Sequence, residues 1–322
     1  MDASELKSVL NEGPLFDEEL SEDHRSGFVA LVGKPNVGKS TLLNAWMGTK
    51  LAPVSPKPQT TRDQLLGILT LEEAQILFMD TPGIHRPRTK LGDYMVEAAE
   101  SVLPEADVVV FVSDLAVPPS REDRETAERL ANLSPDVTQI LAMNKMDRVS
   151  GEERESRRAA YEALGDFAHS LCISALLGEG VDELLRIVIS ALPRGPRYYP
   201  ADQLTDRQER FIVAELVREH AMRHLREEVP HALAVVIQEM KERPNGTIYI
   251  LAHIYVEKDS QKGIVIGRGA SMLKKIGHDA RLDLQRFLDS KVYLDLQVRV
   301  RKNWRRNEKA LRQFGYILQR QT

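Results

Sequence analysis

At residues 33–40 the chain has the sequence Gly33-Lys34-Pro35-Asn36-Val37-Gly38-Lys39-Ser40, which fits the phosphate-binding pattern G-x-x-x-x-G-K-[ST]. In such a loop, glycines let backbone N–H groups point inward around a phosphate at the N-terminal end of a helix. The apolar run 28–32 precedes the loop, and residues 41–47 follow it with helical character. Because strand, glycine loop and helix are the setting that this pattern requires, we expect the loop to bind phosphate groups.

Two further segments complete a phosphate and metal site. Lys39 supplies a positive charge for the β- and γ-phosphates, and Ser40 offers a hydroxyl to Mg²⁺. Forty residues after Ser40, an apolar run ends in Asp80-Thr81-Pro82-Gly83. A carboxylate at a strand end can hold Mg²⁺ through water, and a following glycine N–H can contact a terminal phosphate. D-x-x-G is common in turns, but this placement favours a functional interpretation.

The motif Asn144-Lys145-Met146-Asp147 predicts which base is bound. Guanine presents adjacent N1–H and N2–H₂ donors that one carboxylate can accept, whereas adenine has an acceptor at N1. Asp147 therefore discriminates between the two bases, because adenine leaves it unpaired. We expect Asn144 to brace the loops, the Lys145 stem to lie over the base, and a backbone N–H of Ser174-Ala175-Leu176 to reach guanine O6. A helix cap at 144–147 is the competing interpretation.

The order of elements predicts the fold of residues 27–192. Strands and helices alternate, which indicates an α/β doubly wound, mostly parallel sheet. The motifs follow strand ends, where ligands bind in such sheets. The expected strands are 28–32, 65–71, 75–79, 107–112, 138–143 and 170–173, and the expected helices are 41–47, 121–133 and 181–192.

Composition places the chain among globular proteins and shows an uneven charge. The chain has 322 residues, for which two domains are the default expectation, and it has neither an apolar run of membrane-spanning length nor a secretory signal pattern. Its single cysteine, Cys172, excludes a disulfide framework and is expected to be a core thiol in a reducing cytoplasm. Residues 262–322 carry 15 Lys and Arg against 5 Asp and Glu, while the chain's net charge is −4. This imbalance predicts that the C-terminal end contacts a polyanion. Residues 1–26 are acidic and are expected to form a flexible extension.

The remainder divides into a linker, 193–206, and a second domain, 207–322. A helix is expected at 206–228, and strands are expected at 232–237, 247–257 and 292–300. A second helix is expected after Ser271, with its inward residues at Leu273, Ile276, Ala280, Leu284 and Leu288. His220, His224 and Glu228 share a helical row, which we interpret as an exposed face and not a metal site. A glycine loop at a helix start can clamp a nucleic-acid backbone, whereas Trp304 is interpreted as a packing residue. The candidate RNA contacts are Gly267, Arg268, Gly269, Lys274, Lys275, Arg299, Arg301 and Arg305.

These motifs, in this order, resemble those of translation-factor-class GTPases. The resemblance includes the phosphate loop, Gln59-Thr60-Thr61-Arg62, and the motifs at 80–83, 144–147 and 174–176. The C-terminal part resembles a type II KH RNA-binding domain, from Arg197-Tyr198-Tyr199-Pro200 through Ile266-Gly267 to Asn303-Trp304-Arg305-Arg306. The combination is similar to the Era family of bacterial GTPases over nearly all of residues 27–322.

The resemblance implies a GTPase that uses GTP/GDP and Mg²⁺, binds the 3′ end of 16S rRNA and assists assembly of the 30S subunit. It also implies a monomeric cytoplasmic protein with peripheral association with the inner face of the cell membrane. The implied metal ligands are Ser40, Thr61 and Asp80, with Thr61 preferred to Thr60 on the family pattern. The implied catalytic residues are Lys39, Thr61, Gly83 and Asn36. The implied nucleotide contacts are Gly33, Asn36, Val37, Gly38, Lys39, Ser40, Thr41, Asp80, Gly83, Asn144, Lys145, Asp147, Ser174, Ala175 and Leu176.

Three positions qualify this assignment. Ile84 stands where many small GTPases have the glutamine that orients water, a substitution that the family shares. Without a general base or an arginine finger in cis, hydrolysis is expected to be slow unassisted, and neither Arg62 nor Arg86 is favoured for that role. Relatives with Asn36 use it to hold K⁺, which we carry over as a hypothesis. Ala270 replaces the last glycine of the KH clamp G-x-x-G, and Gly269 is a candidate to supply the missing backbone freedom.

Alternatives from other classes remain open at this point. A P-loop ATPase or kinase would share the phosphate loop but not the specificity expected of Asp147. The C-terminal module could serve in protein docking or dimerisation, and membrane attachment is a third possibility. The last is disfavoured, because no basic amphipathic helix is evident.

Overall fold

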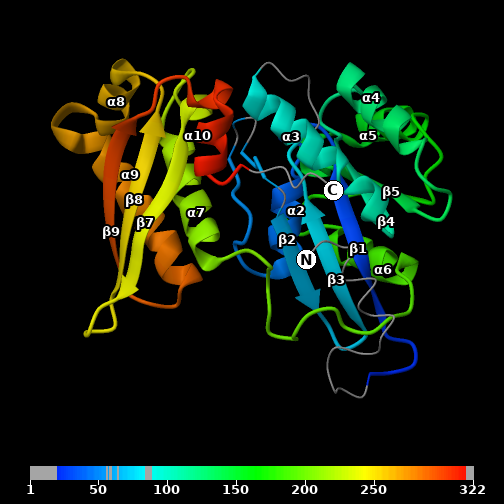
Figure 1. Cartoon of the computed structure of the whole chain (residues 1–322). Coiled ribbons are helices and arrows are strands. Elements are labelled where there is room, and N and C mark those ends of the chain that lie inside the picture. The colour runs from blue at the N-terminus through cyan, green and yellow to red at the C-terminus, as the bar shows by residue number, and fades with distance from the viewer. Residues whose placement is uncertain (1–19, 56, 58–59, 64, 84–88, 317–322) are drawn as a thin grey trace. The chain divides into compact units, whose positions relative to one another are not determined.

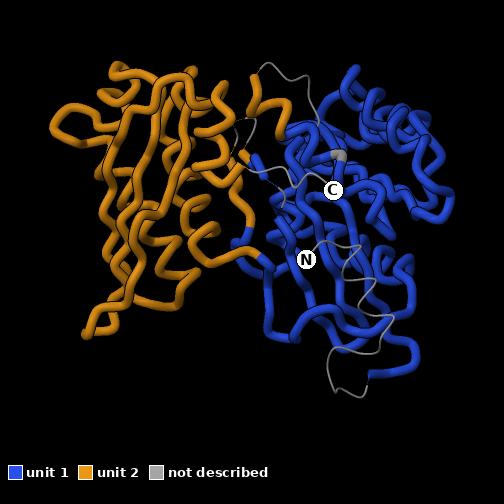
Figure 2. Tube along the Cα trace, in the orientation of Figure 1, with its two compact units in different colours: residues 1–51, 61–85, 95–206 blue, residues 52–60, 86–94, 207–322 orange. Residues whose placement is uncertain are grey.

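The computed structural model describes residues 20–55, 57, 60–63, 65–83 and 89–316. Most of the acidic extension, together with Gln59, Ile84 and Arg86, lies outside these residues. The chain divides into two compact units (Figure 2): unit 1 is Met1–Leu51, Thr61–His85 and Met95–Asp206, and unit 2 is Ala52–Thr60, Arg86–Tyr94 and Arg207–Thr322. The stretch 193–206, expected as a linker, thus falls in unit 1.

Unit 1 is built on a six-stranded sheet with the order β2-β3-β1-β4-β5-β6 (Figure 1). Strand β2 runs antiparallel to β3, and the other neighbours are parallel. This arrangement confirms the predicted doubly wound, mostly parallel fold. The strands are β1 (Arg25–Val32), β2 (Leu65–Thr70), β3 (Ala74–Asp80), β4 (Val108–Asp114), β5 (Thr138–Asn144) and β6 (His169–Cys172).

The core of unit 1 follows from the position of β1 between β3 and β4. Its residues Val29 to Val32 are fully buried, as a central parallel strand covered on both faces requires. The helices of unit 1 are α2 (Lys39–Met47), α4 (Arg121–Leu130), α5 (Gly151–Glu162), α6 (Val181–Ala191) and the part of α3 (Lys90–Glu100) from Met95 onward. Cys172 is only half-buried, and this burial raises the pKa of its thiol.

Two of these helices were not predicted. Helix α5 has the sequence GEERESRRAAYE, in which Tyr161 is the buried residue. A helix with so little apolar surface has no periodic stripe from which it can be recognised. Helix α3 contains Gly92, which weakens a helical pattern.

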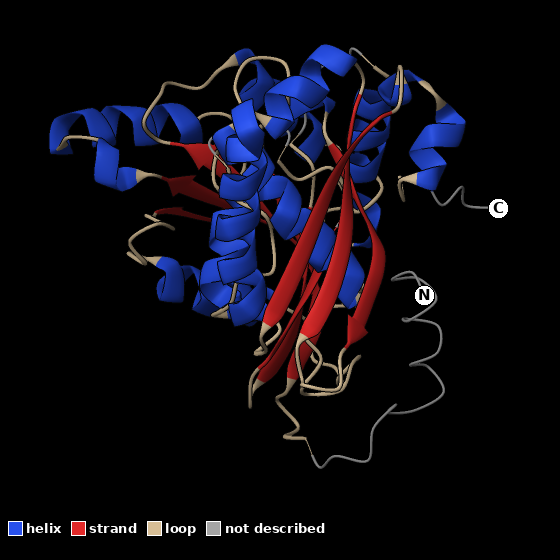
Figure 3. Cartoon of the chain, turned by 90° about the vertical axis from the view of Figure 1, so that its left-hand side faces the viewer, coloured by secondary structure: helices blue, strands red, loops and turns tan. Residues whose placement is uncertain are grey.

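Unit 2 contains the expected α+β domain. Its sheet has the order β7-β8-β9, antiparallel between β7 and β8 and parallel between β8 and β9 (Figures 1 and 3). Helix α7 packs on β7, helix α9 packs on β9, and the two helices contact each other. The elements are α7 (Glu209–His224), β7 (Ala234–Glu242), β8 (Ile248–Val256), α8 (Asp259–Ile266), α9 (Ser271–Phe287), β9 (Val292–Val300) and α10 (Glu308–Gln313). Helix α8 was not predicted, because it is short and contains Gly263.

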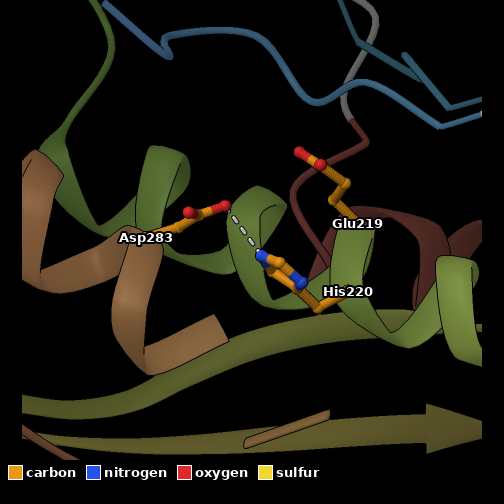
Figure 4. Close-up of side chains that lie close together, drawn as sticks. All are labelled: Glu219, His220 and Asp283. Atoms are coloured by element: carbon orange, nitrogen blue, oxygen red, sulfur yellow. Dashed lines mark hydrogen bonds and ion pairs between the residues drawn. The ribbon is translucent and has the colours of Figure 1, made fainter. Parts of the chain in front are cut away.

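The histidine row on α7 is not an exposed face, so that interpretation was wrong. His220 is buried, and its Nε2 lies 2.8 Å from Asp283 Oδ2 on α9. One turn further along, His224 Nε2 lies 2.6 Å from Asp279 Oδ2. Glu219, His220 and Asp283 bring possible ligand atoms within 4.8 Å of one another (Figure 4). These atoms already have partners, however, since His220 contacts Asp283 and Glu219 Oε1 lies 2.6 Å from Arg223 Nη2 on the same helix. The two histidine–aspartate contacts join α7 to α9, which only the fold brings together.

Trp304 is a packing residue, as expected. Its side chain is fully buried, and its indole Nε1–H donates to the carbonyl of Ala232 at 2.9 Å. Across the described part of the chain, no helix has both the length and the apolar character needed to cross a membrane.

Candidate nucleotide-binding and RNA-binding sites

The phosphate loop joins β1 to α2, and its conformation depends on two glycines. Gly33 has φ +142°, and a Cβ there would lie 2.2 Å from the carbonyl oxygen of Val112. Gly38, at the start of α2, has φ +106°, and a Cβ there would lie 2.2 Å from the Asn144 side-chain nitrogen. A larger residue fits at neither position, so the loop can curl tightly against β4 and β5. This places the N-terminus of α2, a favourable position for an anion, at the carboxyl edge of the sheet.

Lys39 lies across the inside of this loop. The side chain is 6% exposed, and Nζ donates to the carbonyls of Gly33 at 3.0 Å and Lys34 at 3.2 Å. Burial lowers the pKa of Lys39 to about 8, although the nearby Asp80 carboxylate acts in the opposite direction. Because burial disfavours the charged form of Lys39, a phosphate anion bound in the loop would stabilise the ammonium and raise its pKa.

Three oxygen ligands converge beside the loop. Ser40 Oγ donates to Asp80 Oδ2 at 2.7 Å and lies 2.9 Å from Thr61 Oγ1, which is 3.4 Å from the same carboxylate oxygen. Asp80 is fully buried, and burial raises its pKa against the effects of Lys39, Ser40 and Thr61. Its Oδ1 finds no hydrogen-bond partner among the described residues. Two hydroxyls and a buried carboxylate suit a hard cation such as Mg²⁺.

Gly83 brings the end of the D-x-x-G segment against the phosphate loop. A Cβ at Gly83 would lie 2.5 Å from the backbone nitrogen of Pro35. Thr81 is buried, and its hydroxyl donates to the carbonyl of Leu31 at 2.8 Å. The absence of a side chain at Gly83 therefore permits close backbone approach between β3's exit and the loop.

On the base side, Asn144 joins three loops. Its Nδ2 donates to the carbonyl of Val37 at 2.8 Å, and its Oδ1 accepts from the backbone N–H of Ala175 at 2.9 Å and of Lys145 at 2.8 Å. Ser174 Oγ donates to Asp147 Oδ1 at 2.6 Å, so a residue 27 positions away orients the carboxylate expected to bind guanine. Leu176 is exposed.

Two partners of the predicted residues could not be identified from the motifs. Lys145 Nζ pairs with Asp114 Oδ2 at 2.6 Å and donates to the carbonyl of Asn36 at 2.7 Å. Lys34 pairs with the buried Asp123 at 2.7 Å. Asp114 is the last residue of β4. Its position at the carboxyl end of a parallel strand could have identified it from the sequence as a residue of the site. Asp123 instead belongs to a capping box with Ser120 at the start of α4.

The structure brings together the nucleotide-site residues expected from the sequence in unit 1. Ser40 and Thr41 lie in α2, the donors Thr61 and Asp80 lie beside it, and Asn144 braces the base-side loops. Arg62 is 1% exposed.

The predicted RNA clamp lies in unit 2 between α8 and α9. Gly267 and Gly269 have φ values of +72° and +59°. Ala270 also has φ +59°, so the alanine itself adopts the left-handed conformation usually left to glycine. The left-handed conformation at position 270 is therefore adopted by the alanine itself, and Gly269 does not take over this role by itself. Lys274 and Lys275 follow in α9.

The remaining RNA candidates lie around β9 and already have polar partners. Arg299 Nη2 donates to Gln297 Oε1 at 2.8 Å, and Arg301 Nη2 donates to Gln313 Oε1 at 3.1 Å. Arg305 forms a two-pronged pair with Glu257, at 3.0 and 2.6 Å, which neutralises part of its charge.

Comparisons with known proteins match both the nucleotide-binding and the C-terminal parts of the chain. A family model described as 50S ribosome-binding GTPase matches residues 28–145, and a KH-domain model matches residues 228–305. GTPase Era of Geotalea uraniireducens is 48% identical over 292 residues, which span 91% of this chain and 98% of that protein. A crystal structure of Era in complex with MgGDPNP and nucleotides 1506–1542 of 16S ribosomal RNA is 39% identical, with a TM-score of 0.86 over 92% of this chain and 100% of that one. The structure of a point variant of Aquifex aeolicus Era bound to GDP and AlF₄⁻ gives the same identity and TM-score, over 91% and 100% of the two chains.

Proposed function

The chain belongs to the Era family of GTPases, and from this we propose that it is a GTP-driven switch that binds the 3′ end of 16S rRNA and assists assembly of the 30S ribosomal subunit. As a member of this family, the protein hydrolyses GTP to GDP and phosphate. The observation that carries the guanine-nucleotide part of the proposal is the position of Asp147, which Ser174 holds at 2.6 Å; the RNA part rests on the likeness to the Era–16S rRNA complex. This carboxylate is bonded into the loop network that Asn144 also joins to the phosphate loop.

We assign the roles in the nucleotide site as follows. Lys39 binds the β- and γ-phosphates, and the backbone N–H of Gly83 contacts the terminal phosphate. Ser40, Thr61 and Asp80 hold Mg²⁺, which when bound neutralises charge on the phosphates. Asp147 accepts from guanine N1–H and N2–H₂, and a backbone N–H of 174–176 donates to guanine O6. No described side chain is assigned to activation of water, so unassisted hydrolysis is expected to be slow.

The proposed domains are a GTPase domain at 27–192, a linker at 193–206 and a KH RNA-binding domain at 207–322. From the family we also carry over a monomeric state, a cytoplasmic location and peripheral contact with the inner membrane face. A role of the C-terminal module in protein docking is the second candidate. Gly267 and Gly269, whose positive φ values shape the loop before α9, favour the RNA-binding proposal.

Potassium is a further proposed ligand, held by Asn36 beside the phosphates. Asn36 has φ +64°, and its carbonyl accepts from Lys145 Nζ at 2.7 Å, so its backbone is fixed within the loop. We expect GTP turnover to be several-fold faster in potassium chloride than in sodium chloride at equal ionic strength. The difference should disappear in Asn36→Gly, which keeps the left-handed conformation but removes the amide. Identical turnover of the wild type in both salts would contradict the proposal.

Replacing Gly267 by aspartate tests the RNA clamp. A Cβ at this position would lie 2.8 Å from the backbone nitrogen of Met272, and the new carboxylate would repel a phosphate. We expect RNA affinity to fall about 10- to 100-fold, with GTP binding unchanged. Filter binding of the full chain to an RNA of 16S nucleotides 1506–1542 measures this, and the wild type should show a steep salt dependence.

Gly246→Asp is the matched control for this change. Gly246 also has a positive φ, +73°, and lies in the turn between β7 and β8 with no atom within 4 Å of its Cβ position. The substitution Gly246→Asp adds the same negative charge to unit 2, but in a different loop from the clamp at 267–270. Unchanged RNA affinity of a folded Gly267→Asp protein would favour protein docking instead.

A further inference from the structure

Part of the segment that precedes Thr61 belongs to unit 2. Residues 52–60 group with the KH unit and not with the phosphate loop (Figure 2). Three described residues of this segment, Val54, Lys57 and Thr60, make hydrogen bonds with helix α7. Each bond involves a basic side chain and a backbone carbonyl.

Arg218 makes the most buried of these contacts. Its side chain is 1% exposed, and Nη2 donates to the carbonyl of Thr60. Glu215, three residues earlier on α7, orients the guanidinium by accepting from Nε at 2.8 Å and from Nη2. A buried guanidinium has no acceptor of its own and needs partners for its N–H groups. Loss of the hydrogen bond to the Thr60 carbonyl would therefore leave a buried N–H of Arg218 without an acceptor, which is energetically unfavourable.

A second arginine repeats this arrangement one turn later. Glu219 is fully buried and pairs with Arg223 Nη2 at 2.6 Å. Arg223 then donates to the carbonyl of Val54 from Nε at 3.2 Å and from Nη2 at 3.0 Å. In both cases a glutamate of α7 orients an arginine of α7 toward the backbone of residues 52–60.

Lys57 makes a contact in the opposite direction. Its Nζ donates to the carbonyls of Met222 and Leu225, at the C-terminal end of α7. Carbonyls in the last turn of a helix lack partners within the helix, and a cation is favourable there. The segment and the helix thus hold each other through donors on both sides.

The next residue along the chain carries the metal-site hydroxyl. Thr61 belongs to unit 1, where its Oγ1 lies 2.9 Å from Ser40 Oγ. The carbonyl that Arg218 binds is the one joined by a peptide bond to the Thr61 nitrogen. Because that bond is planar and rigid, a displacement of Thr61 from Ser40 also displaces the acceptor of Arg218.

We propose that helix α7 positions the metal-binding threonine, with Arg218 as the positioning residue and with Arg223 and Lys57 fastening the rest of the segment. The proposal rests on the nucleotide-switch function proposed above and specifies how that switch is linked to the KH unit. In GTPase switches, contacts with the γ-phosphate and Mg²⁺ order such a segment and are lost on hydrolysis; here Thr61 would make the contact with Mg²⁺. The hydrogen bond from Arg218 to Thr60 favours the state in which Thr61 is ordered at the metal site. By thermodynamic linkage, ordering of Thr61 in turn favours the α7 conformation that makes this bond.

The variant Arg218→Met tests the proposal. We would measure the rates at which a fluorescent non-hydrolysable GTP analogue and fluorescent GDP dissociate from it at a series of Mg²⁺ concentrations. Methionine keeps an apolar stem but cannot donate to the carbonyl. We expect the Mg²⁺ concentration that half-stabilises the GTP analogue to rise about tenfold, and the GDP complex to change less than twofold. Arg218→Lys, which keeps one donor, should recover part of the loss. An equal change with both nucleotides, or none with either, would overturn the proposal.

Two further variants keep the result interpretable. Arg210→Met changes an exposed arginine of the same helix whose described partner is the Met240 carbonyl, and it should match the wild type. Arg223→Met removes a more exposed side chain and should give a smaller shift in the same direction even if Arg218→Met does not fold; no shift in the folded Arg223→Met would count against the proposal.

The same proteins separate this proposal from the function on which it rests. A wild type that fails to bind the 16S RNA fragment would refute the RNA-binding function, while the Mg²⁺ titration would still decide the role of Arg218. A wild type whose RNA affinity differs between GTP-analogue and GDP states should lose most of that difference in Arg218→Met. An undiminished difference would overturn the proposed linkage.

Discussion

Asp147→Asn is expected to exchange guanine specificity for xanthine specificity. Guanine offers two donors to the carboxylate, whereas xanthine replaces the N2 amino group with a carbonyl and needs one donor and one acceptor. Asparagine supplies both. Ser174 can still donate to its Oδ1 across the 2.6 Å contact, so the side chain should keep its orientation. Asp147 is exposed in the free protein and would be covered by the bound base. Because a covered polar group left unpaired by the wrong base is discriminated against strongly, GTP affinity should fall about 10⁴-fold, and XTP should become the better ligand.

Competition of GTP, XTP and ATP against a fluorescent nucleotide measures this change. Asp166→Asn, at an exposed aspartate of unit 1, is the control and should retain the wild-type order of affinities. Restoration of binding by XTP distinguishes altered recognition from a damaged fold, since a misfolded site would bind neither nucleotide. If the variant kept its preference for GTP, or if the wild type preferred ATP, the assignment of Asp147 to guanine would be wrong.

Lys39→Met is expected to lower nucleotide affinity by about 10³-fold and to remove a pH dependence that the wild type should show. The loss follows from removing a charge-assisted contact to the phosphates at a buried position. The pKa of Lys39 is lowered to about 8 by burial, and the negative phosphates of a bound nucleotide should raise it again.

The sign of the pH effect follows from these two states. Below about pH 8 the ammonium is charged in both the free and the bound protein, so affinity does not change with pH. Above it, binding must take up a proton, and affinity should fall by up to tenfold per pH unit until the bound-state pKa is reached. Calorimetric titrations at pH 7 and about pH 9, in buffers of different ionisation enthalpy, measure the proton uptake directly.

Two controls accompany the lysine change. Any pH dependence of affinity that remains in Lys39→Met reports titration of the nucleotide itself. Lys309→Met removes an exposed lysine of unit 2 and should leave both affinity and proton uptake unchanged. Proton uptake that persisted undiminished in Lys39→Met would show that another group titrates on binding.

Much of the nucleotide site could be predicted because its motifs are local and follow strand ends. Gly33 to Ser40, Asp80 and Asn144 lie at the carboxyl ends of β1, β3 and β5, and parallel strands bring those ends to one edge. The predicted strand β9 matches the observed Val292–Val300, since alternation of apolar residues has the period of a strand. Local pattern and sheet topology are thus sufficient for these features.

The misses arose where local sequence is ambiguous. The charged sequence of α5 has no apolar stripe, and the eight residues of α8 are too few to establish a helical period. The histidines of α7 were assigned to an exposed face because a helical row does not reveal its partners. Their aspartates are on α9, 63 and 55 positions further along the chain.

From its residues alone, the chain specifies the nucleotide class, the sheet and the basic C-terminal end, because each depends on spacing, periodicity or charge. Three features depend instead on contacts between distant positions: Ser174 with Asp147, Asp114 with Lys145, and Arg218 with Thr60. No propensity or period encodes such pairs. The phosphate loop can thus be recognised in eight consecutive residues, whereas the attachment of residues 52–60 to α7 appears only when the chain is folded, since it joins side chains to backbone carbonyls about 160 residues away.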